Sequence, residues 1–253
     1  MIYDLQKASM LKRISAWLLD IILLAIVAAG FALLFSGLFG FDAHNETLNN
    51  AYAKYEQEYG IQFDITHDSY DALSQEQKDL YQAAYDSLSA DREAVYAYNM
   101  LMQLSVLIAT LGILFAYLLL EFAVPLWLKN GQTVGKKIFG IAIMRADGVQ
   151  INAVSLFVRT VLGKYTIETM IPVLIIMMVF WGSIGILGPI ILALIALLQL
   201  ILLIVSKTNN AIHDYLANTV TVDFSSQLIF RTTEELIAYQ KRVAAEKASR
   251  QTY

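Results

Sequence analysis

The sequence predicts an all-α membrane protein with four transmembrane helices, and two properties of the 253-residue chain lead to this class. Hydrophobic residues make up 57% of the chain and charged residues 16%, whereas a soluble domain carries about 45–50% and about 25%. The apolar residues are also clumped into long runs, which are typical of bilayer-spanning helices. A net charge of −4 argues against nucleic-acid binding, which requires a basic excess.

Four apolar runs are long enough to be spans, and they cover residues 14–39, 100–128, 165–181 and 189–205. At about 1.5 Å per residue, the first run exceeds the ~30 Å hydrocarbon core of a bilayer. The last two runs are short and are joined by a glycine-rich link, residues 182–188. We therefore expect them to form a tight helical hairpin, with Pro189 in the first turn of the last helix.

The positive charges predict the orientation of these spans. Lys and Arg number 3 before the first run, 3 in residues 40–99, 6 in residues 129–164 and 6 after residue 205. By the positive-inside rule, both termini and residues 129–164 are cytoplasmic. Residues 40–99 hold 12 of the 22 acidic residues, and we expect them to form an extracytosolic insert.

The insert is predicted to be a small helical cap. Apolar and tyrosine side chains repeat at helical spacing, the first helix ends at Gly60, and Ser74 with Gln77 forms a capping box at the start of the second. We expect the two helices to pack through these faces: Leu48, Tyr52, Tyr55 and Tyr59 on the first, and Tyr81, Tyr85 and Leu88 on the second.

The predicted cytoplasmic elements are short. Residues 140–144 and 149–151 flank an Asp-Gly turn and predict a small β-hairpin, which residues 219–222 could join. Residues 152–164 are amphipathic and are expected to lie along the membrane interface. Residues 234–248 predict a tail helix. The predicted domains are a membrane domain over residues 1–223, with residues 40–99 inserted, and a cytoplasmic tail over residues 224–253.

Charged residues inside the spans are the candidate functional residues, because each costs about 2.5–3.5 kcal/mol at a helix centre. Asp20 in the first span and Glu121 in the second lie at the same depth near the cytoplasmic side, and Glu168 begins the third. Asp20 needs a cationic partner from another element, or from a long side chain on its own helix. The candidates are Arg159, Lys164 and Arg13.

These charges predict a polar cavity in the inner leaflet. Burial raises the pKa of a carboxyl group and a cationic neighbour lowers it, so such a group can exchange a proton for a cation. We expect a small proton-linked transporter of monovalent cations or another small ligand. A purely structural ionic network is the competing interpretation. The candidate transport or ion-site residues are Arg13, Asp20, Glu121, Arg159, Glu168 and Asp214.

An alternative function is a non-transporting membrane scaffold, or an accessory or resistance factor, that binds a protein partner through its extracytosolic insert. The spans favour this alternative, because none is visibly broken in mid-membrane apart from Pro172, whereas carriers often use broken helices.

The sequence contains no complete enzymatic motif, and we expect no catalytic residue, metal or cofactor. Residues 131–136 read GQTVGK, but three residues instead of the four of a P-loop separate the glycines, and Lys137 replaces the Ser or Thr. The three histidines are spread over both predicted sides of the membrane. The chain has no cysteine. The expected partners are membrane lipid, protons, monovalent cations and a second copy of the chain.

Four motifs in order resemble those of RDD-family membrane proteins. The segment from Arg13 through Ala16 to Asp20 is similar to the family's R-x-x-A-x-x-x-D opening, residues 131–136 to its GQTxGK segment, and Asp147-Gly148 to its aspartate–glycine turn. Residues 213–219 resemble the closing HDxxAxT pattern. The family is named for one arginine and two aspartates, which by motif position are Arg13, Asp20 and Asp214.

The resemblance implies a prokaryotic cytoplasmic membrane and transport, with cation–proton antiport suggested for some members. In that function Asp20 is the protonatable group and Arg13 positions it. The 60-residue segment 40–99 is long for the family. Residues expected to shape the cytoplasmic mouth are Gly131, Gln132, Thr133, Gly135, Lys136 and His213, and Gly140 joins them as a glycine that permits a tight turn.

Overall fold

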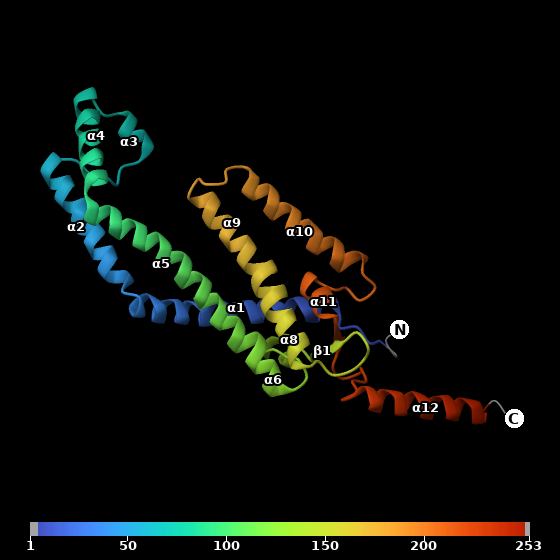
Figure 1. The fold of residues 1–253 in the computed structure, drawn as a ribbon. Coiled ribbons are helices and arrows are strands. Elements are labelled where there is room, and N and C mark those ends of the chain that lie inside the picture. Colours follow the sequence, from blue (N-terminus) through green and yellow to red (C-terminus); the bar gives the residue numbers. More distant parts are fainter. Residues whose placement is uncertain (1–4, 251–253) are drawn as a thin grey trace. The chain divides into compact units, whose positions relative to one another are not determined.

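The computed structural model describes residues 5–250 and divides the chain into two compact units (Figure 1). The first unit contains residues 5–28 and 113–250, and the second contains residues 29–112. Both boundaries fall inside helices, α1 (Met10–Leu38) and α5 (Arg92–Tyr117). The outermost residues of the predicted domains, 1–4 and 251–253, lie outside the described residues.

Four helical stretches are long and apolar enough to cross a membrane, as the sequence predicts. The first is α1 and the fourth is α10 (Leu187–Val205). The second, Arg92–Leu128, joins α5, a π-helical segment η1 (Leu118–Ala123) and α6 (Val124–Leu128). The third, Ala153–Phe180, joins α8 (Ala153–Phe157), a longer π-helical segment η2 (Val158–Met170) and α9 (Ile171–Phe180).

The third stretch corrects one expectation. Residues 152–164 do not form a separate interfacial helix, because α8 and η2 continue into α9 as one helical stretch. The sequence pattern places Arg159 at an aqueous interface, whereas the structure buries it to 2% exposure against an acidic partner. Because the Arg159 guanidinium is paired inside the protein, it does not have to stay at the aqueous interface, and the helix continues past Arg159 into the third span.

The predicted hairpin of the last two spans is confirmed, and α9 packs beside α10 in Figure 1. Gly182 and Gly185 in the link have φ values of +68° and +54°, which glycine adopts without steric cost. Pro189 lies in the first turn of α10, where its missing N–H has no helical acceptor to lose.

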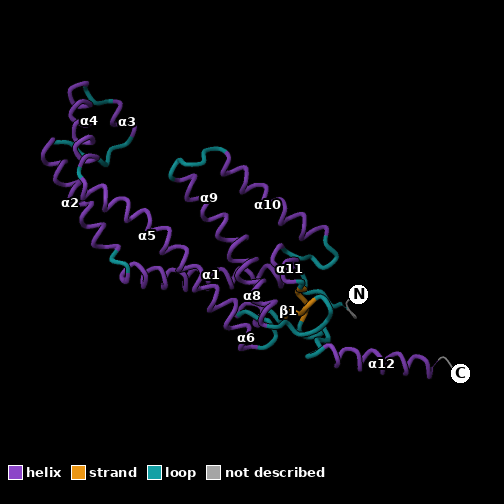
Figure 2. The backbone as a smooth tube through the Cα atoms, viewed as in Figure 1, coloured by secondary structure: helices purple, strands orange, loops and turns teal. Residues whose placement is uncertain are grey.

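The sheet, coloured orange in Figure 2, pairs β1 (Ile141–Arg145) with β2 (Thr219–Asp223). The two strands are antiparallel, with Met144 opposite Val220. The Asp147–Gly148 turn forms as predicted, but residues 149–151 pair with β1 through one bridge, Met144 to Gln150, and Val149 forms a second bridge to Phe230. The prediction that residues 140–144 pair mainly with residues 149–151 is therefore wrong. Residues 219–222, which were expected to be able to join the hairpin, lie in the main partner strand: their alternating Thr and Val residues favour a strand, and both strands are buried almost throughout.

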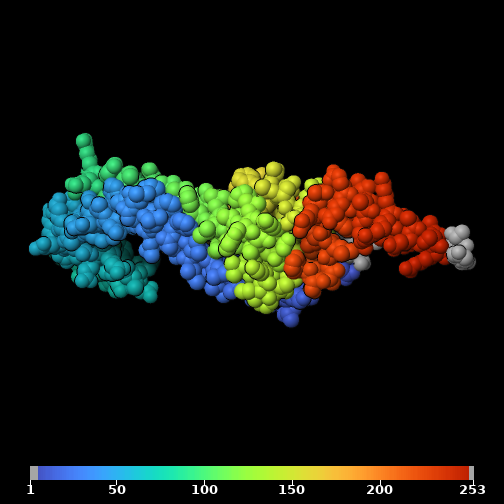
Figure 3. All heavy atoms as spheres, turned by 90° about the horizontal axis from the view of Figure 1, so that it is seen from below, coloured from blue at the N-terminus to red at the C-terminus, as the bar shows by residue number. Residues whose placement is uncertain are grey.

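Two short helices and a tail helix complete the first unit. They are α7 (Val134–Ile138), α11 (Ile212–Ala217) and α12 (Thr233–Arg250). The last confirms the predicted tail helix, and the Thr232 hydroxyl caps it by accepting from the Glu235 amide. Leu236 and Tyr239 of α12 pack on Phe230 and Val149. Most other side chains of α12 are exposed, as its red spheres show in Figure 3.

The second unit contains α2 (Phe41–Tyr59), α3 (His67–Asp71) and α4 (Gln75–Ala90), with parts of α1 and α5. The predicted helix end at Gly60 and the capping box of Ser74 and Gln77 are both confirmed. Helices α2 and α4 pack together as expected. Tyr85, however, is 54% exposed. Leu88 is buried as predicted, and Ala84 takes the inward position beside it in place of Tyr85.

Candidate functional site

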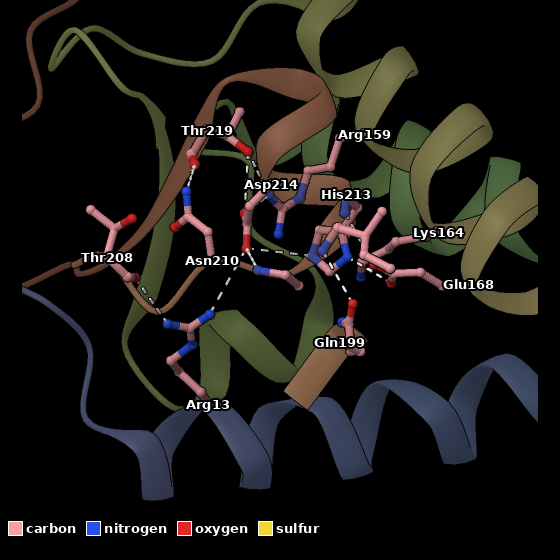
Figure 4. A network of polar contacts seen from close by, with 12 residues as sticks. Arg13, Arg159, Lys164, Glu168, Gln199, Thr208, Asn210, His213, Asp214 and Thr219 are labelled. Atoms are coloured by element: carbon pink, nitrogen blue, oxygen red, sulfur yellow. Dashed lines mark hydrogen bonds and ion pairs between the residues drawn. The ribbon is translucent and has the colours of Figure 1, made fainter. Parts of the chain in front are cut away.

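A buried arginine–aspartate pair lies at the centre of the first unit (Figure 4). Arg159 of η2 donates from Nη1 to the carboxylate of Asp214 in α11, and also to the Thr219 hydroxyl at 2.6 Å. The other Asp214 oxygen accepts from the Ala211 amide at 3.1 Å. Burial alone raises the pKa of Asp214, but the charge and hydrogen bond of Arg159, the charge of His213 and the Ala211 amide together outweigh it and hold that pKa well below its usual range.

Arg13 approaches the same carboxylate from α1. Its Nη2 lies 3.9 Å from Oδ2 of Asp214, and its Nη1 donates to the Thr208 carbonyl at 3.5 Å. The prediction that Arg13 positions Asp20 is therefore wrong. The two residues lie two turns apart on one helix, and the long Arg13 side chain is directed to α11 instead (Figure 4). Two arginines consequently share one aspartate.

Asp20 holds the GQTVGK segment against α1. Its carboxylate accepts from the Thr133 hydroxyl at 2.5 Å, from the Gly135 amide at 2.8 Å and from Nζ of Lys136 at 3.4 Å. The expected partners Arg13, Arg159 and Lys164 are replaced by these three groups. Gly135 makes the contact possible, because a Cβ atom there would lie 2.4 Å from the Ala16 carbonyl oxygen.

Two lysines and two acids continue this network. Nζ of Lys136 also lies 4.0 Å from Glu121, and Nζ of Lys164 lies 2.7 Å from the same carboxylate. The shared contact with Lys136 confirms that Asp20 and Glu121 lie near one another. Burial lowers the pKa of Lys136, although the charges of Glu121 and Asp20 counteract the effect.

His213 pairs with Glu168. The Glu168 carboxylate accepts from the backbone amide of His213 at 3.0 Å and contacts the ring Nδ1 at 2.7 Å. Burial, reinforced by the charge of Arg159, lowers the pKa of His213 below its usual range. Gly163 permits this arrangement, because a Cβ atom there would lie 2.5 Å from Cβ of His213.

A cavity of about 630 Å³ brings most of these residues together, and that volume suits a small-molecule ligand. Its apolar wall comes largely from α1 and α10. Among residues 5–250, no group of three or more histidines and acids could hold a metal ion. The charged and histidine side chains lining the cavity are Arg13, Asp20, Glu121, Lys136, Arg159, Lys164, Glu168 and His213.

The remaining predicted residues lie behind the cavity and shape its wall. Asp214 is completely buried behind the arginines, and Thr133 and Gly135 anchor Asp20. Gln132 donates to the Ile141 carbonyl at 2.7 Å and so joins the turn to β1. Gly131 has φ +63°, and its Cβ would lie 2.8 Å from Ile151. Gly140 also turns the chain, with φ +64°.

Sequence reasoning missed Gly163 and Asn210. Gly163 stands inside a helical segment, where glycine costs about 1 kcal/mol relative to alanine, and that cost is the signal that could have identified it. Asn210 is buried and donates to the Thr219 carbonyl at 3.2 Å. Because Asn209 precedes it, the sequence does not indicate which of the two asparagines is buried. Lys164 was expected as a partner of Asp20 and instead binds Glu121.

Comparison with known proteins supports the motif resemblance. The model of the RDD family matches residues 7–218, which is most of the chain and includes the first three motifs and all but the last residue of the fourth. No curated protein and no solved structure matches it. Of the arginine and two aspartates of the motifs, Arg13 contacts Asp214, and Asp20 contacts Lys136 in a second cluster of the first unit. The chain also has four helices that are long and apolar enough to cross a membrane. The chain therefore belongs to the RDD family of membrane proteins.

Proposed function

We propose that this RDD-family protein is a small proton-linked membrane carrier that binds a monovalent cation or another small charged ligand in the cavity of its first unit. The observation that carries the proposal is the cavity itself, about 630 Å³ in volume and lined by seven charged side chains together with His213. Charges at membrane depth are costly, so their concentration around one open volume favours a function over a packing role.

Proton linkage is supported by two groups on the cavity wall. His213 titrates closest to neutral pH among side-chain types, and it lies on Glu168 at 2.7 Å. Asp20 is the second candidate. In the cation version of the proposal, the Lys136 ammonium occupies the position between Asp20 and Glu121, 3.4 and 4.0 Å from the two carboxylates. An entering cation must displace it.

The proposal places the protein in a prokaryotic cytoplasmic membrane with both termini inside and residues 40–99 outside, and it assigns no catalytic step. Because four spans enclose little volume, it also includes a homo-oligomer. The chain has no cysteine, so single cysteines introduced at exposed Glu46 and Lys247 report the sidedness directly. We expect a membrane-impermeant thiol reagent to label the first in intact cells and the second after lysis. The reverse pattern contradicts the orientation.

Proteoliposomes containing a pH-sensitive dye test the transport itself. We expect Na⁺, K⁺ or Li⁺ gradients to move protons through the wild-type protein and through the surface variant Asp147→Asn. We expect Asp20→Asn to remove this movement while the protein stays folded. If the wild-type protein moves no protons with any of the three ions, cation–proton antiport is excluded.

One observation favours the scaffold alternative. Asp20, Glu121, Glu168 and Asp214 each already contact a cationic or N–H partner, as expected of a network that fixes helix packing. In that case Asp20→Asn lowers only the thermal stability, without a change in flux. Deleting residues 42–98 then abolishes capture of a partner protein and leaves the membrane core intact.

A further inference from the structure

The two arginines on the cavity wall have spare hydrogen-bonding capacity. A guanidinium carries five N–H donors. Among residues 5–250, the side chain of Arg13 has two polar contacts, both long: 3.9 Å to Asp214 and 3.5 Å to the Thr208 carbonyl. Nε of Arg159 is buried and has no hydrogen-bond partner within the same described part of the chain. Buried donors without partners are rare, and both arginines are among the residues that line the cavity.

The charge around these donors favours an anion. Arg13 and Arg159 share the single carboxylate of Asp214. The other acids on the wall are already occupied, because Asp20 and Glu121 are contacted by the lysine ammonium groups and Glu168 by His213. Among the described residues, every carboxylate that lines the cavity has a hydrogen-bond donor. Both arginines, in contrast, have N–H donors without an acceptor in that part of the chain. A planar guanidinium suits the paired oxygens of a carboxylate or phosphate.

The rest of the cavity is apolar and continues onto a lipid-type surface. Helix α10 contributes Leu192 and Ile195, and α1 contributes Ile14, Trp17 and Ile21. The α1 side chains also belong to the exposed apolar surface of the protein, and Trp17 is 56% exposed. A small hydrophilic anion would leave this wall unused. An acyl or alkyl chain would cover it and gain about 25 cal/mol for each Å² removed from water.

We propose that the cavity binds a single-chain amphiphile, with its oxyanion head on Arg13 and Arg159 and its chain along α1 and α10. This inference rests on the cavity assigned above to the ligand of the carrier and names the chemical class of that ligand.

Quenching of Trp17 provides the test. The chain has three tryptophans, and Trp127→Phe with Trp181→Phe leaves Trp17 as the reporter on the cavity wall. The full-length variant in an uncharged detergent is titrated with an ω-bromo fatty acid, and separately with the bromo-alcohol of equal chain length, at equal mole fractions in the micelle. Bromine quenches an indole ring only near contact.

We expect the acid to quench Trp17 with an apparent affinity about ten- to one-hundredfold higher than the alcohol, because hydrogen bonds to charged groups discriminate by about this factor. Arg13→Gln should remove the preference, and Arg13→Lys should retain part of it. Lys12→Gln is the matched control, because Lys12 lies next to Arg13 and pairs with Asp223 away from the cavity lining. It should leave the preference unchanged.

Two outcomes overturn the inference without any variant. Equal quenching by acid and alcohol means that the wall takes up any apolar chain. Displacement of the bromo-acid by acetate or inorganic phosphate as effectively as by an unbrominated fatty acid means that the site binds the free anion. The proposed function fails separately: amphiphile binding without flux in proteoliposomes contradicts the carrier, whereas cation flux without a preference for the acid contradicts only this inference.

Discussion

The two units use their acidic residues in opposite ways. Residues 40–99 in the second unit carry 12 of the 22 acids, and most of these side chains are exposed. In the first unit, Asp20, Glu121, Glu168 and Asp214 are buried or half-buried, and each contacts a lysine, arginine or histidine side chain. The comparison teaches that the number of acids in a segment does not say how many of them need partners. Burial does, because removing a charge from water is costly unless a partner compensates it.

One ion pair in each unit illustrates the difference. In the second unit, Nζ of Lys54 lies 3.8 Å from Asp91, but its side chain is 60% exposed. Solvent and salt screen such a pair. In the first unit, Arg159 and Asp214 are almost completely enclosed. Their attraction is strong, and so is the penalty when one partner is lost.

The largest expected effect comes from Asp214→Asn. This change leaves Arg159 buried without its carboxylate, and it also removes the shared partner of Arg13. We expect the free energy of unfolding to fall by about 3–5 kcal/mol. The midpoint of thermal unfolding in detergent measures it.

The double variant Arg159→Met with Asp214→Asn is the matched control. It removes the uncompensated charge together with its partner, so we expect it to regain part of the lost stability. If the double variant is less stable than Asp214→Asn, the pair acts through its hydrogen bonds to Thr219 and Ala211 and not through charge compensation.

A smaller contrast is expected between two glycines. Gly163→Ala places a Cβ atom 2.5 Å from Cβ of His213 in the first unit, and overpacking of this kind costs about 1–3 kcal/mol. Gly37→Ala in the second unit meets no atom within 4 Å and replaces a helical glycine, so it should stabilise by about 0.5–1 kcal/mol. Thermal midpoints that move in the same direction would contradict the assigned close contact.

The pH dependence of stability should come from the first unit through His213. Burial lowers the pKa of His213 in the folded protein, so the unfolded chain binds the proton more readily. Its contribution is therefore complete above pH 6.5 and decreases as the pH falls toward the folded pKa. Each pKa unit of lowering corresponds to about 1.4 kcal/mol.

Thermal midpoints measured from about pH 7.5 to about pH 5 test this dependence. The groups facing the ring are Glu168, Arg159 and Asp214, and His213→Gln keeps a donor near Glu168. We expect the variant to show a flatter midpoint profile over this range. An unchanged profile would assign the acid sensitivity to other groups.

The smallest effect is expected for Lys54→Gln in the second unit. The exposed ammonium contacts Asp91 and the Tyr55 hydroxyl, and water replaces both contacts at little cost. We expect no resolvable change in the thermal midpoint at physiological salt. A loss comparable to that of Gly163→Ala would show that exposed and buried pairs contribute alike, and the contrast between the units would fail.

Much of the fold was predictable from local sequence. The four apolar stretches, the helix end at Gly60, the capping box of Ser74 and Gln77 and the tail helix are all confirmed. Each depends on residues within a few positions of one another. The start of the third span was not predictable in the same way, because it depends on contacts between residues distant in sequence. For the same reason the sequence could name residues 219–222 as a possible partner of β1 but could not rank them above residues 149–151.

The sequence by itself determined the membrane class, the family motifs and the set of charged residues that line the cavity. Only the tertiary structure decided which charges pair. Arg13 contacts Asp214 and not Asp20, while Asp20 accepts from Thr133, Gly135 and Lys136. The physical reason is that a buried charge selects its partner by distance and available donors across helices, and spacing along the chain specifies neither.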